Sequence, residues 1–300
     1  MFGTVPVIST RVFSVMPDKF RDRSKRVPGS APRFHSVDGF LEGPSFDRDG
    51  NLWVVDIPFG RIFRINPTGE WELITQYDGE PNGLKIHKDG RIFIADYKNG
   101  VMVLDPKVGT VKPLLQWRHT ERLRGVNDLF FSSKGDLYFT DQGLSSMSDP
   151  TGRVYRHTAE DKLECLLYNG ISPNGIVLSP AEDILYIGMT VAANVWRMQP
   201  TADGSAKVRM HTQMICGGVD GMAVDEQSNL VVCNVGLGII WIFDKTGMPT
   251  HRINSCGGAN MTNIAYGGAD RKTLYITDSD KGQILVADMV VPGTIMFSHM

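Results

Sequence analysis

The chain has 300 residues, a formal net charge of −2 and 42% hydrophobic residues, which is enough apolar side chain to form packed cores. Its basic residues are dispersed, so it lacks the basic surface of a nucleic-acid-binding protein. It also has no 18-residue apolar run, and its opening stretch MFGTVPVISTRVFSVMP lacks the basic flank of a secretory signal. We therefore expect a cytoplasmic protein with neither nucleic acid nor a membrane as a partner.

One pattern occurs six times along the chain, at intervals of roughly 40 to 47 residues. Each copy opens with a polar residue that leads into a short apolar stretch. The copies begin with EGPSF at Glu42, PNGLKI at Pro81, VNDLFF at Val126, PNGIVL at Pro173, VDGMAV at Val219 and MTNIAY at Met261. A fixed interval of this size is typical of the blades of a β-propeller.

Within each copy, a turn rich in Gly, Asp or Asn leads to a second strand such as LWVVD, IFIAD or LYFTD. A third strand follows another glycine, as in GRIFRINP and GVMVLDP. Apolar and polar residues alternate in these strands, and no stretch keeps the 3.6-residue period of a helix. The sequence therefore predicts an all-β fold, a six-bladed β-propeller of four-stranded antiparallel blades.

The two ends of the chain are expected to meet in one blade. We expect an N-terminal extension over residues 1–37 and a single propeller domain over residues 38–300. The stretch RVFSVM at Arg11–Met16 could close the ring by pairing with QILVADM near the end of the last repeat. The C-terminal GTIMFSHM could compete for the same place.

The four cysteines show no CxxC spacing; they are Cys165, Cys216, Cys233 and Cys256. In a chain of this length we expect them to be reduced, small core residues. A disulfide or zinc framework is not indicated.

A set of polar residues is expected at the mouth of the central channel. The first strand of each propeller blade lines this channel, so the residue at its start points towards the axis. The six copies place there Glu42, Asn82, Asn127, Asn174, Asp220 and one of Thr262 or Asn263. Two carboxylates with several amide oxygens suit a hard cation such as Ca²⁺, Mg²⁺ or Mn²⁺ better than a structural zinc.

A purely structural interpretation competes with this one. Asn-Gly and Asp-Gly are common turn dipeptides, because these residues tolerate left-handed backbone. Glu42, however, is not a turn former, and a carboxylate beside apolar strands is costly unless it is paired or metal-bound. The six copies taken together favour a metal site.

The series EGP, VND, SPNGI and VDGMAVD, in this order and at blade spacing, resembles the senescence-marker-protein, gluconolactonase and luciferin-regenerating-enzyme family. The resemblance covers about residues 38 to 290, and KGDLYFTD and NGIVLSP look closest to its drug-responsive lactonase branch. It implies a six-bladed propeller with one catalytic divalent cation, most simply Ca²⁺, with Mg²⁺, Mn²⁺ or Zn²⁺ as alternatives.

The resemblance also implies roles for individual residues. Glu42 and Asn174 match metal ligands, and Asn127 matches a ligand or substrate contact. Asp220 matches a ligand that also serves as general base or nucleophile. Arg124 is taken as a substrate contact, although it stands three residues before Asn127 where gluconolactonases hold an arginine two before.

Gln142 comes directly after the second strand of its repeat, and Asn234 lies at the end of the second strand of its own repeat. At both points the chain returns to the channel mouth. We expect both to contact the substrate.

These residues together predict a metal-dependent hydrolase that opens a lactone, a small-molecule cyclic ester. The metal would polarise the carbonyl and stabilise the oxyanion, while Asp220 would activate water or attack directly. No GxSxG motif is present, so serine hydrolysis is not indicated. A phosphotriesterase using the same metal site and a non-catalytic propeller that serves as a binding platform are the alternatives. The oligomeric state is expected to be a monomer or a small homo-oligomer.

Overall fold

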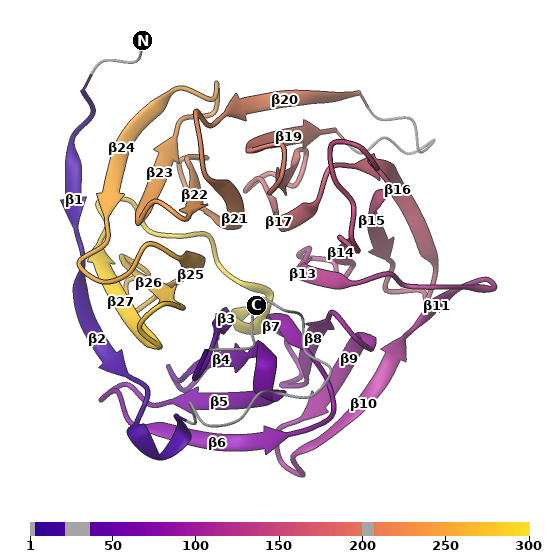
Figure 1. The fold of residues 1–300 in the computed structure, drawn as a ribbon, viewed down its shortest axis with the longest axis horizontal. Helices are drawn as coiled ribbons and strands as arrows, with labels where there is room; N and C mark the ends of the chain where they lie inside the picture. Colours follow the sequence, from indigo (N-terminus) through magenta and orange to yellow (C-terminus); the bar gives the residue numbers. More distant parts are fainter. Residues whose placement is uncertain (1–3, 22–36, 200–206) are drawn as a thin grey trace.

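The computed structural model describes residues 4–21, 37–199 and 207–300. Most of their strands form six blades, each built on four antiparallel strands, arranged around a central axis, as Figure 1 shows. The predicted six-bladed β-propeller is therefore confirmed.

The blades follow one another along the chain. The first contains β3 (Leu41–Phe46), β4 (Leu52–Asp56), β5 (Arg61–Ile65) and β6 (Trp71–Gln76). The second contains β7 (Pro81–Ile86), β8 (Ile92–Asp96), β9 (Gly100–Asp105) and β10 (Thr110–Leu115). The third contains β13 (Val126–Phe131), β14 (Leu137–Asp141), β15 (Gly152–His157) and β16 (Leu163–Gly170).

The second half repeats this plan. The fourth blade contains β17 (Pro173–Leu178), β18 (Leu185–Met189), β19 (Asn194–Met198) and β20 (Val208–Gln213). The fifth contains β21 (Gly218–Val224), β22 (Leu230–Val235), β23 (Ile239–Phe243) and β24 (Pro249–Asn254). The sixth contains β25 (Met261–Gly267), β26 (Thr273–Asp278) and β27 (Gln283–Asp288), with a fourth strand from the other end of the chain.

That fourth strand is β2 (Arg11–Val15), which pairs antiparallel with β27, with Arg11 opposite Val286. The ring is thus closed by the pairing considered in the sequence analysis. A further strand, β1 (Val7–Ser9), adds in parallel to the outer strand β24 of the fifth blade. The boundary between an extension and the propeller at residue 37 stays a prediction.

Packing between neighbouring blades supplies the core. Trp53 and Val55 of β4, for example, belong to one buried cluster with Leu84 and Ile94 of the second blade. Because each blade is covered on both faces, inner strands such as β4 and β8 are buried along their whole length. This explains why their sequences are almost continuously apolar and do not alternate as the sequence analysis expected.

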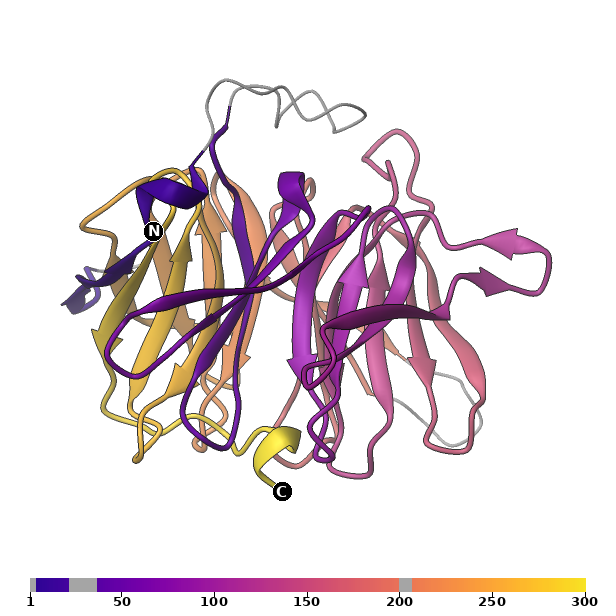
Figure 2. The ribbon, with the colours of Figure 1, turned by 90° about the horizontal axis from the view of Figure 1, so that it is seen from below.

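The C-terminal segment, residues 290–300, crosses one end of the channel instead of joining the sixth blade. Thr294 donates its backbone N–H to Val224 at the end of β21, and Ser298 donates its hydroxyl to the carbonyl of Phe46 at the end of β3. Phe297, in the short 3₁₀ helix η4 (Phe297–His299), packs 5.2 Å from the ring of Phe131. Figure 2 shows this segment on one face of the ring.

All four cysteines are free. Cys233 is buried on β22 and Cys165 is half-buried on β16, but Cys216 and Cys256 are exposed. The prediction that all four are core residues is therefore wrong for the last two, which lie in loops outside the apolar strands.

Within the described part of the chain, no helix has the length and apolar character needed to cross a membrane.

Candidate active site at the channel mouth

The first strands of the six blades contact one another in a closed ring around the axis; they are β3, β7, β13, β17, β21 and β25. These strands end beside the C-terminal segment, as the hydrogen bonds of Val224 and Phe46 show. They therefore begin at the opposite end of the channel, which we call the mouth. The predicted polar residues lie there, on the opening residues of these strands.

Each first strand has a β-bulge at this point. The pairing with the second strand shifts register across Glu42/Ser45, Pro81/Gly83, Val126/Leu129, Pro173/Ile176, Val219/Met222 and Met261/Ile264. Bulges leave residues out of the ladder and re-aim their side chains, which is why they are frequent beside active sites. The repeated bulge accounts for six polar side chains at one level of the channel.

The glycine of the Asn-Gly motif has a separate structural role. Asn174 and Gly175 lie inside β17 and not in a turn. A Cβ atom on Gly175 would collide with the carbonyl oxygen of Asp220 in the next blade. The glycine thus permits close approach of two blades, while the preceding asparagine is free to face the mouth.

Glu42 and Asp220 are brought together as buried carboxylates, with exposed fractions of 3% and 8%. Burial raises the pKa of Glu42 well above its ordinary value, and the nearby charges of Asp220 and Asp128 raise it further. One oxygen of Glu42 accepts hydrogen bonds from the backbone of Gly43 at 2.7 Å and from the amide of Asn263 at 2.8 Å. Two buried acids whose charges act on each other repel when both are ionised.

Asn127 is oriented by Gln142. Its amide nitrogen donates to the Gln142 side-chain oxygen at 3.1 Å, and the Gln142 nitrogen donates to the hydroxyl of Ser172 at 2.8 Å. The amide of Asn127 is therefore fixed with its oxygen available to a cation, the orientation expected of a metal ligand. Ser172 has a left-handed backbone, with φ of 60°, which is uncommon for a residue with a side chain.

Asn174 is buried at the mouth, and its carbonyl oxygen accepts a 2.7 Å hydrogen bond from Thr140 in the preceding blade. This bond fixes the backbone of Asn174, so the start of β17 is anchored to β14.

Arg124 is held by an ion pair. Its guanidinium pairs with Glu121 at 2.9 Å, and Glu121 also pairs with Arg153 at 2.8 Å. Hydrogen bonds from the two arginines lower the pKa of Glu121 to about 2. Glu121 belongs to the small hairpin of β11 (Trp117–Arg118) and β12 (Glu121–Arg122), which lies at the outer edge of the ring in Figure 1.

Asn234 is also engaged structurally. Its amide donates to the carbonyls of Cys216 and Gly218, at 3.1 Å each, and its oxygen accepts from the Trp241 indole at 3.3 Å. These bonds hold the loop that leads into β21, which begins at Gly218, two residues before Asp220.

Four other blades place an aspartate at the corresponding end of the second strand: Asp56, Asp96, Asp141 and Asp278. Each accepts hydrogen bonds from backbone N–H groups, either of the loop that leads into its own blade or of the loop that follows its second strand. Asp56 accepts one from Phe40 at 2.7 Å, and Asp141 accepts one from Gly125 at 2.8 Å. The recurring terminal Asp of LWVVD, IFIAD and LYFTD was the sequence signal for this role. Asn234 is the version of it in the fifth blade.

Three channel residues were missed by the sequence analysis or left ambiguous. Asp128 and Asn263 each come one residue after a predicted channel-mouth residue, Asn127 and Thr262. The Asn263 amide nitrogen lies 3.5 Å from an oxygen of Asp128. Lys85 lies further along β7 and is buried. The dipeptides Asn-Asp and Thr-Asn at the bulges were the available signal for the first two.

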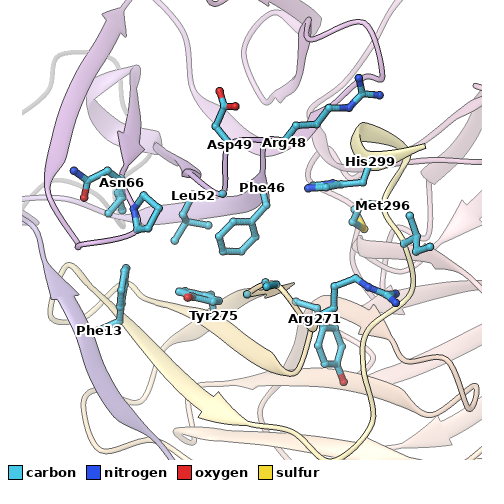
Figure 3. Close-up of a pocket in the computed structure, with 18 of the residues that line it drawn as sticks. Phe13, Phe46, Arg48, Asp49, Leu52, Asn66, Arg271, Tyr275, Met296 and His299 are labelled. Carbon is cyan, nitrogen blue, oxygen red and sulfur yellow. The ribbon is translucent and has the colours of Figure 1, made fainter.

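A partly open pocket lies away from the mouth. It has a volume of about 570 Å³ and lies between the first and sixth blades, beside the C-terminal segment. Figure 3 shows Phe46 and Tyr275 next to each other in its wall, with ring centroids 4.8 Å apart, and Arg271, Met296 and His299 towards one end. Both arginines of this cavity are already bound, Arg271 to Glu226 and Arg48 to the carbonyls of Ser298 and Met300.

The donor set at the mouth fits a hard divalent cation. Among the described residues, no group of three or more His, Cys, Asp and Glu side chains could hold a metal ion. The predicted set differs in composition, because it combines two carboxylates with two asparagine oxygens. Burial raises the pKa of Glu42 most, and the charge of Asp220 raises it further; a cation between the two acids would relieve this repulsion.

Comparison with known proteins agrees with this fold. A family model described as the SMP-30/gluconolactonase/LRE-like region matches residues 40–280. Lactonase drp35 of Staphylococcus aureus strain MRSA252 is 34% identical over 227 residues, which cover 71% of this chain and 69% of the relative. Lactonase drp35 of Staphylococcus epidermidis strain ATCC 12228 is 32% identical over 228 residues, covering 71% and 69%.

Two solved structures share the fold at lower identity. Regucalcin of Agrobacterium tumefaciens, a calcium-binding protein, has a TM-score of 0.79 at 20% identity, covering 99% of each chain. The gluconolactonase XC5397 of Xanthomonas campestris has a TM-score of 0.75 at 20% identity, covering 97% of this chain and 98% of that one. With its six blades and the match over residues 40–280, the chain belongs to the SMP-30/gluconolactonase/LRE-like family.

Proposed function

We propose that the protein is a divalent-metal-dependent hydrolase that opens a lactone at the channel mouth. The observation that carries the proposal is the pair of buried carboxylates, Glu42 and Asp220, whose charges act on each other at the start of two first strands. Membership of a family with relatives named lactonase supports lactones as the substrate class.

Glu42, Asn127, Asn174 and Asp220 would hold the cation. All four offer oxygen, and oxygen ligands favour Ca²⁺ over the softer transition metals, with Mg²⁺, Mn²⁺ and Zn²⁺ as further candidates for the test. A bound divalent cation supplies Lewis acidity, which polarises the carbonyl of the lactone.

Asp220 is the proposed general base or nucleophile. As a base it takes the proton of the attacking water. As a nucleophile its carboxylate attacks the carbonyl carbon, the ring C–O bond breaks and its oxygen leaves as the alcohol, and water then hydrolyses the resulting anhydride to regenerate Asp220. Gln142 keeps the Asn127 oxygen aimed at the mouth through its 3.1 Å hydrogen bond. Substrate contacts by Arg124, Asn127, Gln142 and Asn234 are also proposed, as are the cytoplasmic location and the oligomeric state.

The test is hydrolysis by protein that is stripped with chelator and then titrated separately with Ca²⁺, Mg²⁺, Mn²⁺ and Zn²⁺. The substrates are aldonolactones and bulkier aromatic lactones. We expect no hydrolysis after stripping and recovery with one of the ions.

The matched variants are Asp220→Asn and Asp288→Asn. Asp288 is an exposed carboxylate paired with Arg11 on the outside of the ring. Loss of a positioned acid–base group lowers the rate by about 100- to 10,000-fold, so Asp220→Asn should be nearly inactive and Asp288→Asn unchanged. A folded Asp220→Asn protein with wild-type activity, or full activity in chelator, would show the mechanism to be wrong.

A further inference from the structure

Lys85 is a charged residue buried in the lower half of the channel, between the mouth and the C-terminal segment. Its exposed fraction is 8%. The small cavity beside it is lined by residues from all six first strands, including Pro44, Phe130, Val177, Met222 and Ile264. This cavity has a volume of about 20 Å³, which leaves space for about one water molecule.

The surroundings of Lys85 do not compensate its charge locally. Lys85 is the charged member of a lining that is otherwise apolar apart from Tyr266 and Thr294. Its ammonium donates to the carbonyl of Leu84 at 3.1 Å, which satisfies one of three N–H groups. A buried ammonium among apolar side chains is costly unless an opposite charge acts on it.

The opposite charge is Asp128, which follows Asn127 in the bulge of β13 and is 2% exposed. Burial raises the pKa of the Asp128 carboxyl, and the positive charge of Lys85 is the largest of the causes that lower it. Among the described residues no direct ion pair joins the two, but they lie on neighbouring first strands, β7 and β13, which contact each other. The Asp128 carboxylate lies against β7, since a Cβ on Gly83 would be 2.6 Å from its oxygen. The Asn263 amide nitrogen, 2.8 Å from Glu42 and 3.5 Å from Asp128, connects this level of the channel to the mouth.

The charge of the channel then has a simple balance. In the part of the chain that the structure describes, three carboxylates are buried along it: Glu42, Asp220 and Asp128. A divalent cation offsets two of these charges and leaves one uncompensated.

We propose that Lys85 is a fixed cation of the channel, which neutralises Asp128 and thereby sets the strength of cation binding at the mouth. With Asp128 neutralised, Glu42 and Asp220 match the charge of one divalent cation. Lys85 is thus a positioning residue, since it acts through Asp128 and not on the substrate. This inference rests on the metal-dependent function proposed above.

The experiment measures the Ca²⁺ dissociation constant by calorimetry for the chelator-stripped wild type and three variants: Lys85→Met, Asp128→Asn and the double variant. Lys85→Met leaves an extra negative charge near the mouth, so Ca²⁺ should bind at least about tenfold more tightly. Asp128→Asn leaves an extra positive charge, so Ca²⁺ should bind at least about tenfold more weakly. The double variant should return to within about threefold of the wild type, because the pair acts as a unit.

The melting temperature in chelator is the second readout. We expect each single variant to melt below the wild type and the double variant to recover part of the loss. The control is Lys112→Met, which removes the same charge from the outer strand β10 of the same blade, where the side chain is exposed. It should change neither quantity.

The outcomes separate this inference from the proposed function. If Lys85 serves packing alone, Lys85→Met melts lower but binds Ca²⁺ as the wild type does, and the opposite shifts do not occur. That result overturns the inference and keeps the metal site. If the wild type binds no divalent cation, the proposed function fails, and the melting temperatures in chelator still decide the pair: additive losses overturn it and recovery in the double variant supports it.

Discussion

Asn127 offers its side-chain oxygen to the mouth because its amide nitrogen is already bound by Gln142. Gln142 can accept that bond because its own nitrogen is bound by Ser172. A chain of two hydrogen bonds therefore decides which end of an amide faces the site. Residues of this kind hold a ligand in place without contacting the metal.

Replacing Gln142 by Met should weaken cation binding. The methionine fills a similar volume but cannot accept the bond from Asn127, whose amide then loses its fixed orientation. Loss of such an orienting partner costs about 10- to 100-fold in metal affinity. Calorimetric titration of the stripped protein with Ca²⁺ measures the effect.

Gln142→Glu is the companion variant, because a carboxylate still accepts hydrogen bonds from Asn127 and from the Ser172 hydroxyl. It should bind Ca²⁺ more tightly than Gln142→Met. Equal affinity of Gln142→Met and the wild type would remove Gln142 from the site.

At the scale of the strand, His211 on β20 is a group that responds to acid. Burial and the charge of Arg197 lower its pKa to about 4, and its ring packs 5.0 Å from the ring of Tyr186. The Nε2 atom is buried without a hydrogen-bond partner among the described residues. Protonation would therefore place a charged donor where no acceptor lies.

The folded protein should lose stability as the pH falls from about 6.5 to about 4. In this range the unfolded chain binds a proton at His211 and the folded chain does not, so acid favours unfolding. Because the ring is partly open to solvent, the loss is roughly 1–2 kcal/mol. Urea unfolding at several pH values should show a smaller acid loss for His211→Leu than for the wild type.

Arg197→Met removes the second cause of the low pKa, so its acid loss should be intermediate between the two. Identical pH dependence in all three proteins would contradict this account of His211.

The strand is also the scale at which sequence reasoning reached furthest. Alternation and turn residues predicted the blades, and the repeat predicted that Glu42, Asn127, Asn174 and Asp220 open first strands. The same alternation failed one residue later, at Asp128. A regular strand sends successive side chains to opposite faces, but the bulge leaves Asn127 and Asp128 both outside the ladder.

Other contacts of the site were out of reach for a different reason. The link from Asn263 to Glu42 joins residues 221 positions apart, and it depends on how the sixth blade meets the first. The engagement of Arg124 by Glu121 depends on a two-residue hairpin strand that carries no clear strand signal. Neither follows from spacing within one repeat.

For the whole molecule, ring closure depends on β2. Its residue Phe13 packs 5.2 Å from Tyr275 in the sixth blade, and Met16, 1% exposed, donates its N–H to Gly282 at 2.9 Å. Without β2, the edge of β27 would carry unpaired backbone groups.

Deleting residues 1–16 should lower the melting temperature by more than about 5 °C and cause the protein to associate through the freed edge of β27. Thermal unfolding and light scattering check the two effects. Deletion of residues 1–5, which precede β1, is the control and should leave both unchanged. A monomeric protein with wild-type melting after the longer deletion would show that β2 is dispensable.

The pairing of β2 with β27 also sets a waiting time during synthesis. Arg11 and Asp288, joined by an ion pair, are 277 residues apart, so the ribosome makes one edge of the closing pair long before the other. At about 5–20 residues per second, β2 waits roughly 14–55 s for its partner strand. For that interval the nascent chain has a strand with no ladder to join, which gives a chaperone a defined segment to shield.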